Sequence, residues 1–219
     1  MLQKIPDLGR QHFNDHKEQI RLWNALNYWA FYITLIACGR RSGKTEIPKR
    51  YESQLALTPP KRPPPFDHIT DPYRIIVGGP THQQIKRIYW DDLLDLIPRR
   101  FRKSTNKTDL TIKTIFDNEI ILTGLDTIRI EGVAADLIVV TEADDVKDIV
   151  DKWQNNLEPI LANRGGRAII EGTPNASSAI MFDMAVEARK NPKAFQLYNN
   201  FVPEHLKEKF YELIIKKGP

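Results

Sequence analysis

The chain has 219 residues, of which 41% are hydrophobic and 27% are charged, and its formal net charge is +4. These values are typical of a globular protein with a substantial core. They permit a polyanionic partner without requiring one. The single cysteine, Cys38, excludes an internal disulfide and fits a reducing compartment. With no visible signal peptide and no apolar run long enough to span a bilayer, we expect no membrane association.

The first predicted elements are an irregular N-terminal segment, an amphipathic helix and an apolar strand. They cover residues 1–15, 16–29 and 31–37 respectively. Gln19, on the helix, is a candidate adenine contact, because an amide offers one donor and one acceptor to the edge of a base. A solvated helix glutamine fits the sequence equally well.

A polar loop over residues 38–45 follows the strand and leads into a helix over residues 46–57, the context that a phosphate loop requires. Its backbone N–H groups and the helix N-terminus favour an anion. The predicted nucleotide-binding residues are Gly39, Arg40, Arg41, Ser42, Gly43, Lys44 and Thr45. We expect Lys44 to reach the β- and γ-phosphates and the Thr45 hydroxyl to bind Mg²⁺. The loop is a variant, since Cys38 holds the position of the usual first glycine. The alternative is a lysine and a threonine that only begin a helix.

Residues 58–72 contain six prolines and are predicted to form an exposed loop. A short strand over residues 73–77 follows, and Thr81 is expected to cap the next helix, which Pro98 ends. Basic residues then surround Phe101. They are candidates for contact with a phosphate backbone or, alternatively, form a solvated charged loop: Arg99, Arg100, Arg102 and Lys103.

The remaining elements alternate between strands and helices. Residues 109–115 and 119–123 read as a hairpin, and residues 137–140 as a buried strand. A helix interrupted at Pro159 is predicted to run to about residue 163, and another strand covers residues 168–170. A helix over 179–190, a strand over 195–201 and a helix over 204–217 complete the chain. The sequence thus predicts an α/β fold with a mostly parallel central sheet flanked by helices and an antiparallel hairpin.

Hydrolysis of a bound nucleotide needs a group that orients and deprotonates water. Glu142 follows a buried strand, and the carboxyl ends of parallel strands form ligand sites, so we expect Glu142 and Lys44 to share one cleft, about a triphosphate apart. The residue before Glu142 is Thr141, where such sites usually carry a metal-binding aspartate. A hydroxyl could act through a metal-bound water, at a cost of about 10–100-fold in metal affinity, with Asp144 or Asp145 as candidates to compensate.

Three arginines, Arg40, Arg41 and Arg129, are candidates to stabilise the charge that develops on the transferred phosphoryl group. Arg129 could act on a neighbouring subunit of a ring, and ordinary salt bridges are the alternative for all three. Thr173 follows another buried strand, where a polar group could sense the γ-phosphate; the alternative is a simple turn.

The order of these motifs resembles the ATPase domain of the large terminase subunit, the DNA-packaging motor of tailed bacteriophages. The matching segments are residues 38–45, 79–86, 117–124, 129–144, 153–159 and 172–175, and the resemblance covers residues 15–215. It implies a P-loop NTPase of the RecA-like (ASCE) type that binds ATP and Mg²⁺, with Glu142 catalytic. It also implies that Gly172, Thr173 and Pro174 couple hydrolysis to DNA movement.

The same resemblance implies several partners: double-stranded DNA, a portal protein and a small terminase subunit. The implied assembly is a homo-oligomeric ring at the procapsid portal in the host cytoplasm, although the chain could be a monomer in isolation. Two departures stand out: Thr141, and the lack of the C-terminal nuclease domain that the family usually carries. We expect residues 1–219 to form a single ATPase domain. The alternatives are a helicase-like RecA-type motor and a nucleotide-binding assembly module with weak or no hydrolysis.

Overall fold

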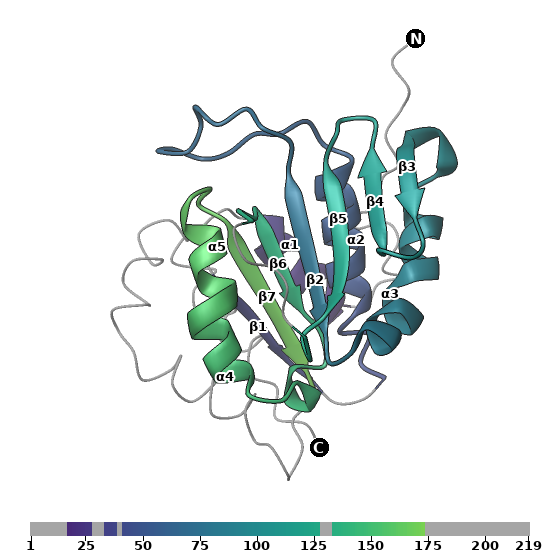
Figure 1. Ribbon diagram of the computed structural model, residues 1–219, viewed down its shortest axis with the longest axis vertical. Coiled ribbons are helices and arrows are strands. Elements are labelled where there is room, and N and C mark those ends of the chain that lie inside the picture. The colour runs from purple at the N-terminus through teal and green to yellow at the C-terminus, as the bar shows by residue number, and fades with distance from the viewer. Residues whose placement is uncertain (1–16, 28–32, 39–40, 128–132, 174–219) are drawn as a thin grey trace.

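The computed structural model describes residues 17–27, 33–38, 41–127 and 133–173, and every structural statement below concerns these residues. Within them, seven strands form one sheet: β1 (Ile33–Ala37), β2 (Arg74–Gly79), β3 (Arg102–Asn106), β4 (Thr111–Thr114), β5 (Glu119–Gly124), β6 (Leu137–Val140) and β7 (Arg167–Gly172). The spatial order is β1-β7-β6-β2-β5-β4-β3 (Figure 1). The first five strands in that order are parallel, and β4 is antiparallel to both of its neighbours. The predicted α/β class with an antiparallel hairpin is confirmed.

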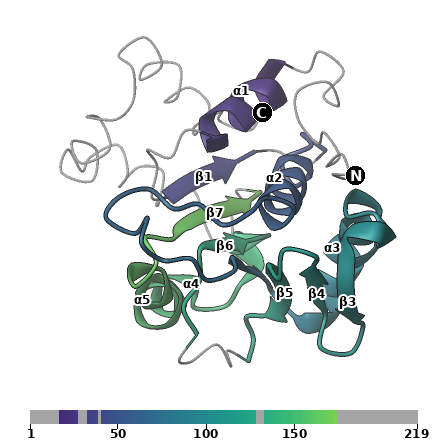
Figure 2. The ribbon, with the colours of Figure 1, turned by 90° about the horizontal axis from the view of Figure 1, so that it is seen from above.

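Helices cover both faces of the sheet (Figure 2). One face carries α1 (Lys17–Asn27), α2 (Glu46–Ala56) and α3 (His82–Leu96), and the other carries α4 (Ile149–Lys152) and α5 (Glu158–Ala162). Two hydrophobic clusters fill the two interfaces. Tyr89 and Val77 belong to the first, and Trp153 and Val140 to the second. The buried strands are apolar on both sides because each side faces a layer of helices.

Local sequence signals explain where α3 begins and ends. The Thr81 side chain accepts a hydrogen bond from the Gln84 backbone N–H at 3.2 Å, which confirms the predicted N-cap. The helix ends at Leu96, two residues before Pro98, because the residue that precedes a proline avoids helical geometry.

The predicted helix that runs to residue 163 is less regular than expected. A π-helical turn (Trp153–Leu157) separates α4 from α5, and Pro159 lies in the first turn of α5. Proline has no N–H for the carbonyl four residues earlier, and its ring displaces that carbonyl, so the disturbance falls before Pro159 and not at it.

The basic residues around Phe101 do not form a loop. Arg99, Arg100 and Phe101 make a short 3-10 helix (Arg99–Phe101), and Arg102 and Lys103 begin the edge strand β3. Lys103 pairs with Asp117 at 2.6 Å. Because β3 runs in the direction of β5, these residues lie at the amino end of the sheet, on its far edge from β1.

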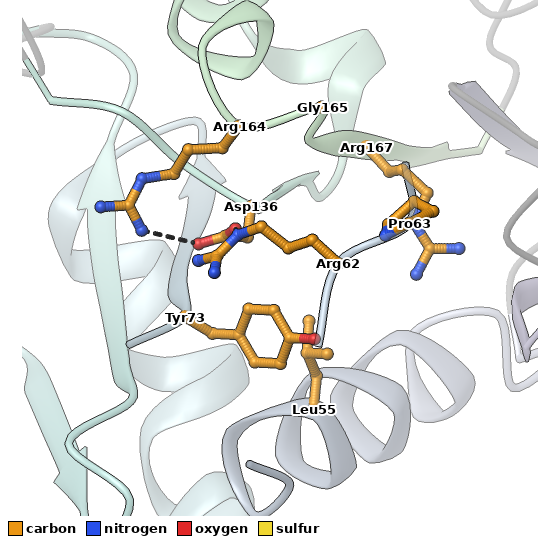
Figure 3. A pocket seen from close by; sticks show the side chains of 8 residues that line it. All are labelled: Leu55, Arg62, Pro63, Tyr73, Asp136, Arg164, Gly165 and Arg167. Carbon is orange, nitrogen blue, oxygen red and sulfur yellow. Dashed lines mark hydrogen bonds and ion pairs between the residues drawn. The ribbon is translucent and has the colours of Figure 1, made fainter. Parts of the chain in front are cut away.

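The proline-rich connection, residues 58–72, is fixed beneath the same amino end of the sheet (Figure 3). The buried Asp136 carboxylate accepts from Arg62 Nε at 2.6 Å, from Arg164 Nη1 at 3.1 Å and from the Arg74 backbone N–H at 2.9 Å. The Arg62 guanidinium lies 5.1 Å above the centre of the Tyr73 ring. A buried carboxylate with three donors is well compensated, so we assign this cluster a structural role.

Candidate nucleotide-binding site

The carboxyl ends of β1, β7 and β6 lie side by side and bring three chain segments together. The backbone N–H of Cys38, just after β1, donates to Gly172 O at the end of β7 at 3.2 Å. On the other side of β7, the Thr141 N–H donates to Gly78 O of β2 at 2.9 Å. Residues 41–45, 141–142 and 171–173 therefore surround the same edge of the sheet, where ligands of open parallel sheets bind.

The described part of the phosphate loop, residues 41–45, has the backbone of a tight loop. Gly43 has φ +75° and Arg41 has φ 62°, both in the left-handed region. A Cβ atom on Gly43 would lie 2.2 Å from Gln19 Nε2, so glycine suits this position for space as well as for conformation. Gly39 and Arg40 lie outside the described residues.

Gln19, predicted to contact adenine, packs beside this loop. Its Nε2 is 3.5 Å from Gly43 O, a long and weak hydrogen bond. The α1 helix thus reaches the candidate site across 24 positions of sequence. Its amide is placed to border a nucleotide bound at the loop.

Lys44 joins the loop to the other two segments. Its Nζ is 3.3 Å from Glu142 Oε1 and 3.0 Å from Thr173 Oγ1. The Lys44 side chain is 8% exposed and that of Glu142 is 32% exposed. The shared site expected for Lys44 and Glu142 is therefore present, but the two groups touch and are not a triphosphate apart.

Glu142 lies directly after Thr141, which follows β6, and has left-handed backbone geometry with φ 49°. A non-glycine residue in this region costs of order 1 kcal/mol and persists only where the surrounding structure requires it. Here the strained turn allows the Glu142 carboxylate to meet Lys44. A short 3-10 helix (Ala143–Asp145) follows, in which Asp144 is buried and Asp145 is exposed.

A second buried group of contacts involves Thr45, which precedes α2. The Thr45 hydroxyl donates to Glu171 Oε2 at 3.1 Å, and the Thr141 hydroxyl donates to the other oxygen, Glu171 Oε1. Glu171 and Thr141 are fully buried. Burial raises the pKa of Glu171, while the hydroxyls of Thr141 and Thr45 and the charge of Lys44 act in the opposite direction. Glu171 was absent from the sequence prediction. Its only signal is a charged residue inside an otherwise apolar strand.

Another carboxyl group, Glu52 on α2, is fully buried near this site. Its two oxygens have no hydrogen-bond partner within the described chain segments. Burial raises its pKa well above the usual value, and the nearby charge of Glu171 adds to the rise, although Lys49 opposes it. Glu52 is therefore in its neutral form over a wider pH range than an ordinary glutamate.

The donor set at this edge fits a hard divalent cation. Mg²⁺ prefers oxygen ligands, keeps several waters and is held by one or two carboxylates together with substrate phosphates. The Thr45 hydroxyl and the Glu171 carboxylate are oxygen groups of this kind, and Thr141 supplies a further hydroxyl beside them. In the parts of the chain that the structure describes, no three His, Cys, Asp or Glu side chains form a preformed metal cluster.

Other predicted site residues are only partly placed. Arg41 is exposed on the loop, Gly172 ends β7, and Thr173 contacts Lys44. Arg129 and Pro174 fall outside the described residues, as do the elements expected over 179–217. The four basic residues around Phe101 lie at the opposite end of the sheet from Lys44.

Comparisons with known proteins were made at the level of sequence and of structure. No protein-family model matches the chain, and no curated protein matches its sequence. Among the helices in the described ranges, none is long and apolar enough to cross a membrane.

Solved structures with the same fold are ATPase domains of phage large terminases. The ATPase domain from Thermus phage P74-26 gives a TM-score of 0.52 at 16% identity, over 87% of this chain and 91% of that chain. The large terminase of bacteriophage HK97 gives 0.58 at 11% identity, over 75% and 34%. The large terminase of a thermophilic bacteriophage, in complex with ATP-gamma-S, gives 0.55 at 16% identity, over 92% and 49%. The chain spans about half or less of the length of these last two proteins. Its P-loop fold is that of phage large terminase ATPase domains.

Proposed function

We propose that this chain is an ATPase domain of a phage DNA-packaging motor, in which ATP hydrolysis drives double-stranded DNA into a procapsid. The observation that carries the proposal is the meeting of Lys44, Glu142 and Thr173 at the carboxyl edge of the sheet. These residues come from the ends of three separate strands, and each has the chemistry that one part of the reaction requires. The fold of the terminase ATPase domains supports the same function.

In this proposal the loop from Gly39 to Thr45 binds the phosphates of ATP. Lys44 is held by Glu142 and Thr173, and it exchanges Glu142 for the β- and γ-phosphate oxygens when ATP binds. Glu142 then faces the terminal phosphate and acts as the general base for the attacking water. Gln19, beside the loop, contacts the adenine. Thr45, and Thr141 through a water, hold Mg²⁺, which would neutralise charge on the phosphates.

Coupling to DNA would begin at Thr173. Its hydroxyl touches the same ammonium that binds the phosphates, so a change in what Lys44 contacts alters the support of residues 172–174. One of Arg40, Arg41 and Arg129 would stabilise the charge on the transferred phosphoryl group, in its own subunit or in a neighbour.

The proposed assembly is a homo-oligomeric ring on the portal protein of a procapsid in the host cytoplasm, supplied with DNA by a small terminase subunit. The basic residues Arg99, Arg100, Arg102 and Lys103 are candidates for contact with the DNA backbone. The three arginines are exposed or half-exposed, whereas Lys103 is paired with Asp117.

The test is phosphate release by the purified chain with Mg²⁺ and ATP, alone and with portal protein and DNA. We expect release that Lys44→Ala abolishes and that Lys113→Ala, a change at an exposed lysine on β4, leaves intact. Absence of Lys44-dependent release in the assembled motor would overturn the proposal.

Two other functions give different results in related assays. A helicase-like motor of the RecA type would separate DNA strands without any capsid component. An assembly module, which Thr141 in place of an aspartate favours, would bind ATP tightly and release no phosphate.

A further inference from the structure

The place where a metal-binding aspartate is usual, position 141, carries no charge in this chain, yet the site contains a buried carboxylate that touches it. That carboxylate belongs to Glu171, at the end of the neighbouring strand β7. It contacts the hydroxyls of both Thr141 and Thr45.

The sheet register explains how a side chain from β7 reaches both groups. Ile170 is paired with Val140, and Glu171 is paired with Ile36 on the other side. Glu171 therefore follows the same alternation as Ile169, whose side chain packs on the face covered by α2. Thr141 follows the alternation of Val139 and points to that face too. Thr45 immediately precedes α2, so all three polar groups meet between the sheet and the start of this helix.

The other acidic groups nearby have different surroundings. Glu142 contacts Lys44 and not Thr45. Glu52 is buried without a hydrogen-bond partner in the described residues, and Asp145 is exposed. Of these four carboxylates, only Glu171 is hydrogen-bonded to the hydroxyl predicted to bind Mg²⁺.

We propose that Glu171 supplies the metal-site carboxylate that position 141 lacks, so that the negative charge has moved by one strand, from β6 to β7. The inference rests on the proposed nucleotide function and adds a residue to it. Glu171 is then a positioning residue for the Thr45 hydroxyl and a holder of Mg²⁺, directly or through water. Thr141 becomes the hydroxyl that orients this carboxylate.

The test is the Mg²⁺ concentration that half-saturates the metal-dependent part of ATP-gamma-S binding, measured by fluorescence titration with no turnover. Glu171→Gln keeps the shape of the side chain and removes its charge. We expect this concentration to rise about 10–100-fold while binding without metal stays within about threefold of wild type. Glu52→Gln is the matched control, since it neutralises a second fully buried carboxyl group that does not contact Thr45, and it should leave the metal dependence unchanged.

A charge exchange makes the test independent of general damage to the fold. Thr141→Asp alone places two carboxylates in contact and should lower both metal affinity and thermal stability. The double variant Thr141→Asp with Glu171→Thr returns one carboxylate and one hydroxyl to the pair, and should regain at least tenfold of the metal affinity lost in Glu171→Gln. Wild-type metal dependence in Glu171→Gln, or a gain in Thr141→Asp alone, overturns the inference and leaves the nucleotide function standing. If the wild-type chain binds no nucleotide, both fail.

Discussion

Replacing Glu142 by glutamine should separate nucleotide binding from hydrolysis. The variant keeps the shape of the side chain but removes the charge that holds Lys44 at 3.3 Å. Loss of a general base typically slows a reaction about 10²–10⁴-fold, so phosphate release should fall by that factor. Binding should move in the opposite direction, because the carboxylate no longer competes with phosphate for the ammonium.

The size of the gain in binding follows from the geometry of the pair. Two unit charges at this distance attract by about 1.3 kcal/mol in water and by about 5 kcal/mol at an effective dielectric constant of 20. Because the Glu142 side chain is 32% exposed, solvent screens the pair and the lower value applies. A gain of about 1 kcal/mol corresponds to about fivefold tighter ATP binding.

The assay is a fluorescent-nucleotide titration beside phosphate release for the same protein preparations. Glu119→Gln is the control, since its side chain is also 32% exposed and pairs with an arginine, Arg74, at the other end of the sheet. Both quantities should be unchanged in that control. The reasoning is refuted if Glu142→Gln hydrolyses ATP at the wild-type rate, or if it loses binding in proportion to hydrolysis.

Three further changes test the fold and the loop. Asp136→Ala leaves the buried Arg62 uncompensated and should lower the free energy of unfolding by about 3–5 kcal/mol, measured by chemical denaturation; a loss below about 1 kcal/mol contradicts the structural role given to this cluster. Glu52→Gln should stabilise the protein increasingly as pH rises above about 4.5, since the raised folded-state pKa of Glu52 makes wild-type stability fall between its unfolded and folded pKa values, by about 1.4 kcal/mol per unit of separation. Equal pH dependence of the two melting curves would show that Glu52 is not buried as described. Gly43→Ala, at φ +75° and beside Gln19, should cost about 1–2 kcal/mol, or about 5–30-fold in nucleotide affinity, and unchanged affinity would count against the loop geometry.

Features set by local sequence could be predicted well. The Thr81 cap, the end of α3 before Pro98 and the β4–β5 hairpin all depend on residues a few positions apart. The proximity of Lys44 and Glu142 was also accessible, because both follow buried strands and such strand ends share one edge of a parallel sheet.

Features set by strand order could not be predicted in the same way. The contact between Glu171 and Thr141 requires β7 to lie between β1 and β6, which no local pattern reveals. The edge strand β3 was missed because its sequence, Arg102–Asn106, is polar and its side chains are mostly exposed. Only pairing with β4 makes it a strand, and polar, charged edges of this kind are common in natural sheets.

The central claim is that ATP binds where Lys44, Glu142 and Thr173 meet, and a crystal structure with Mg²⁺ and a non-hydrolysable ATP analogue tests it most directly. We predict the terminal phosphate between Lys44 Nζ and the Glu142 carboxylate, with the present 3.3 Å contact between these two groups opened. A nucleotide bound elsewhere on the molecule, with the Lys44–Glu142 pair intact, would contradict the account.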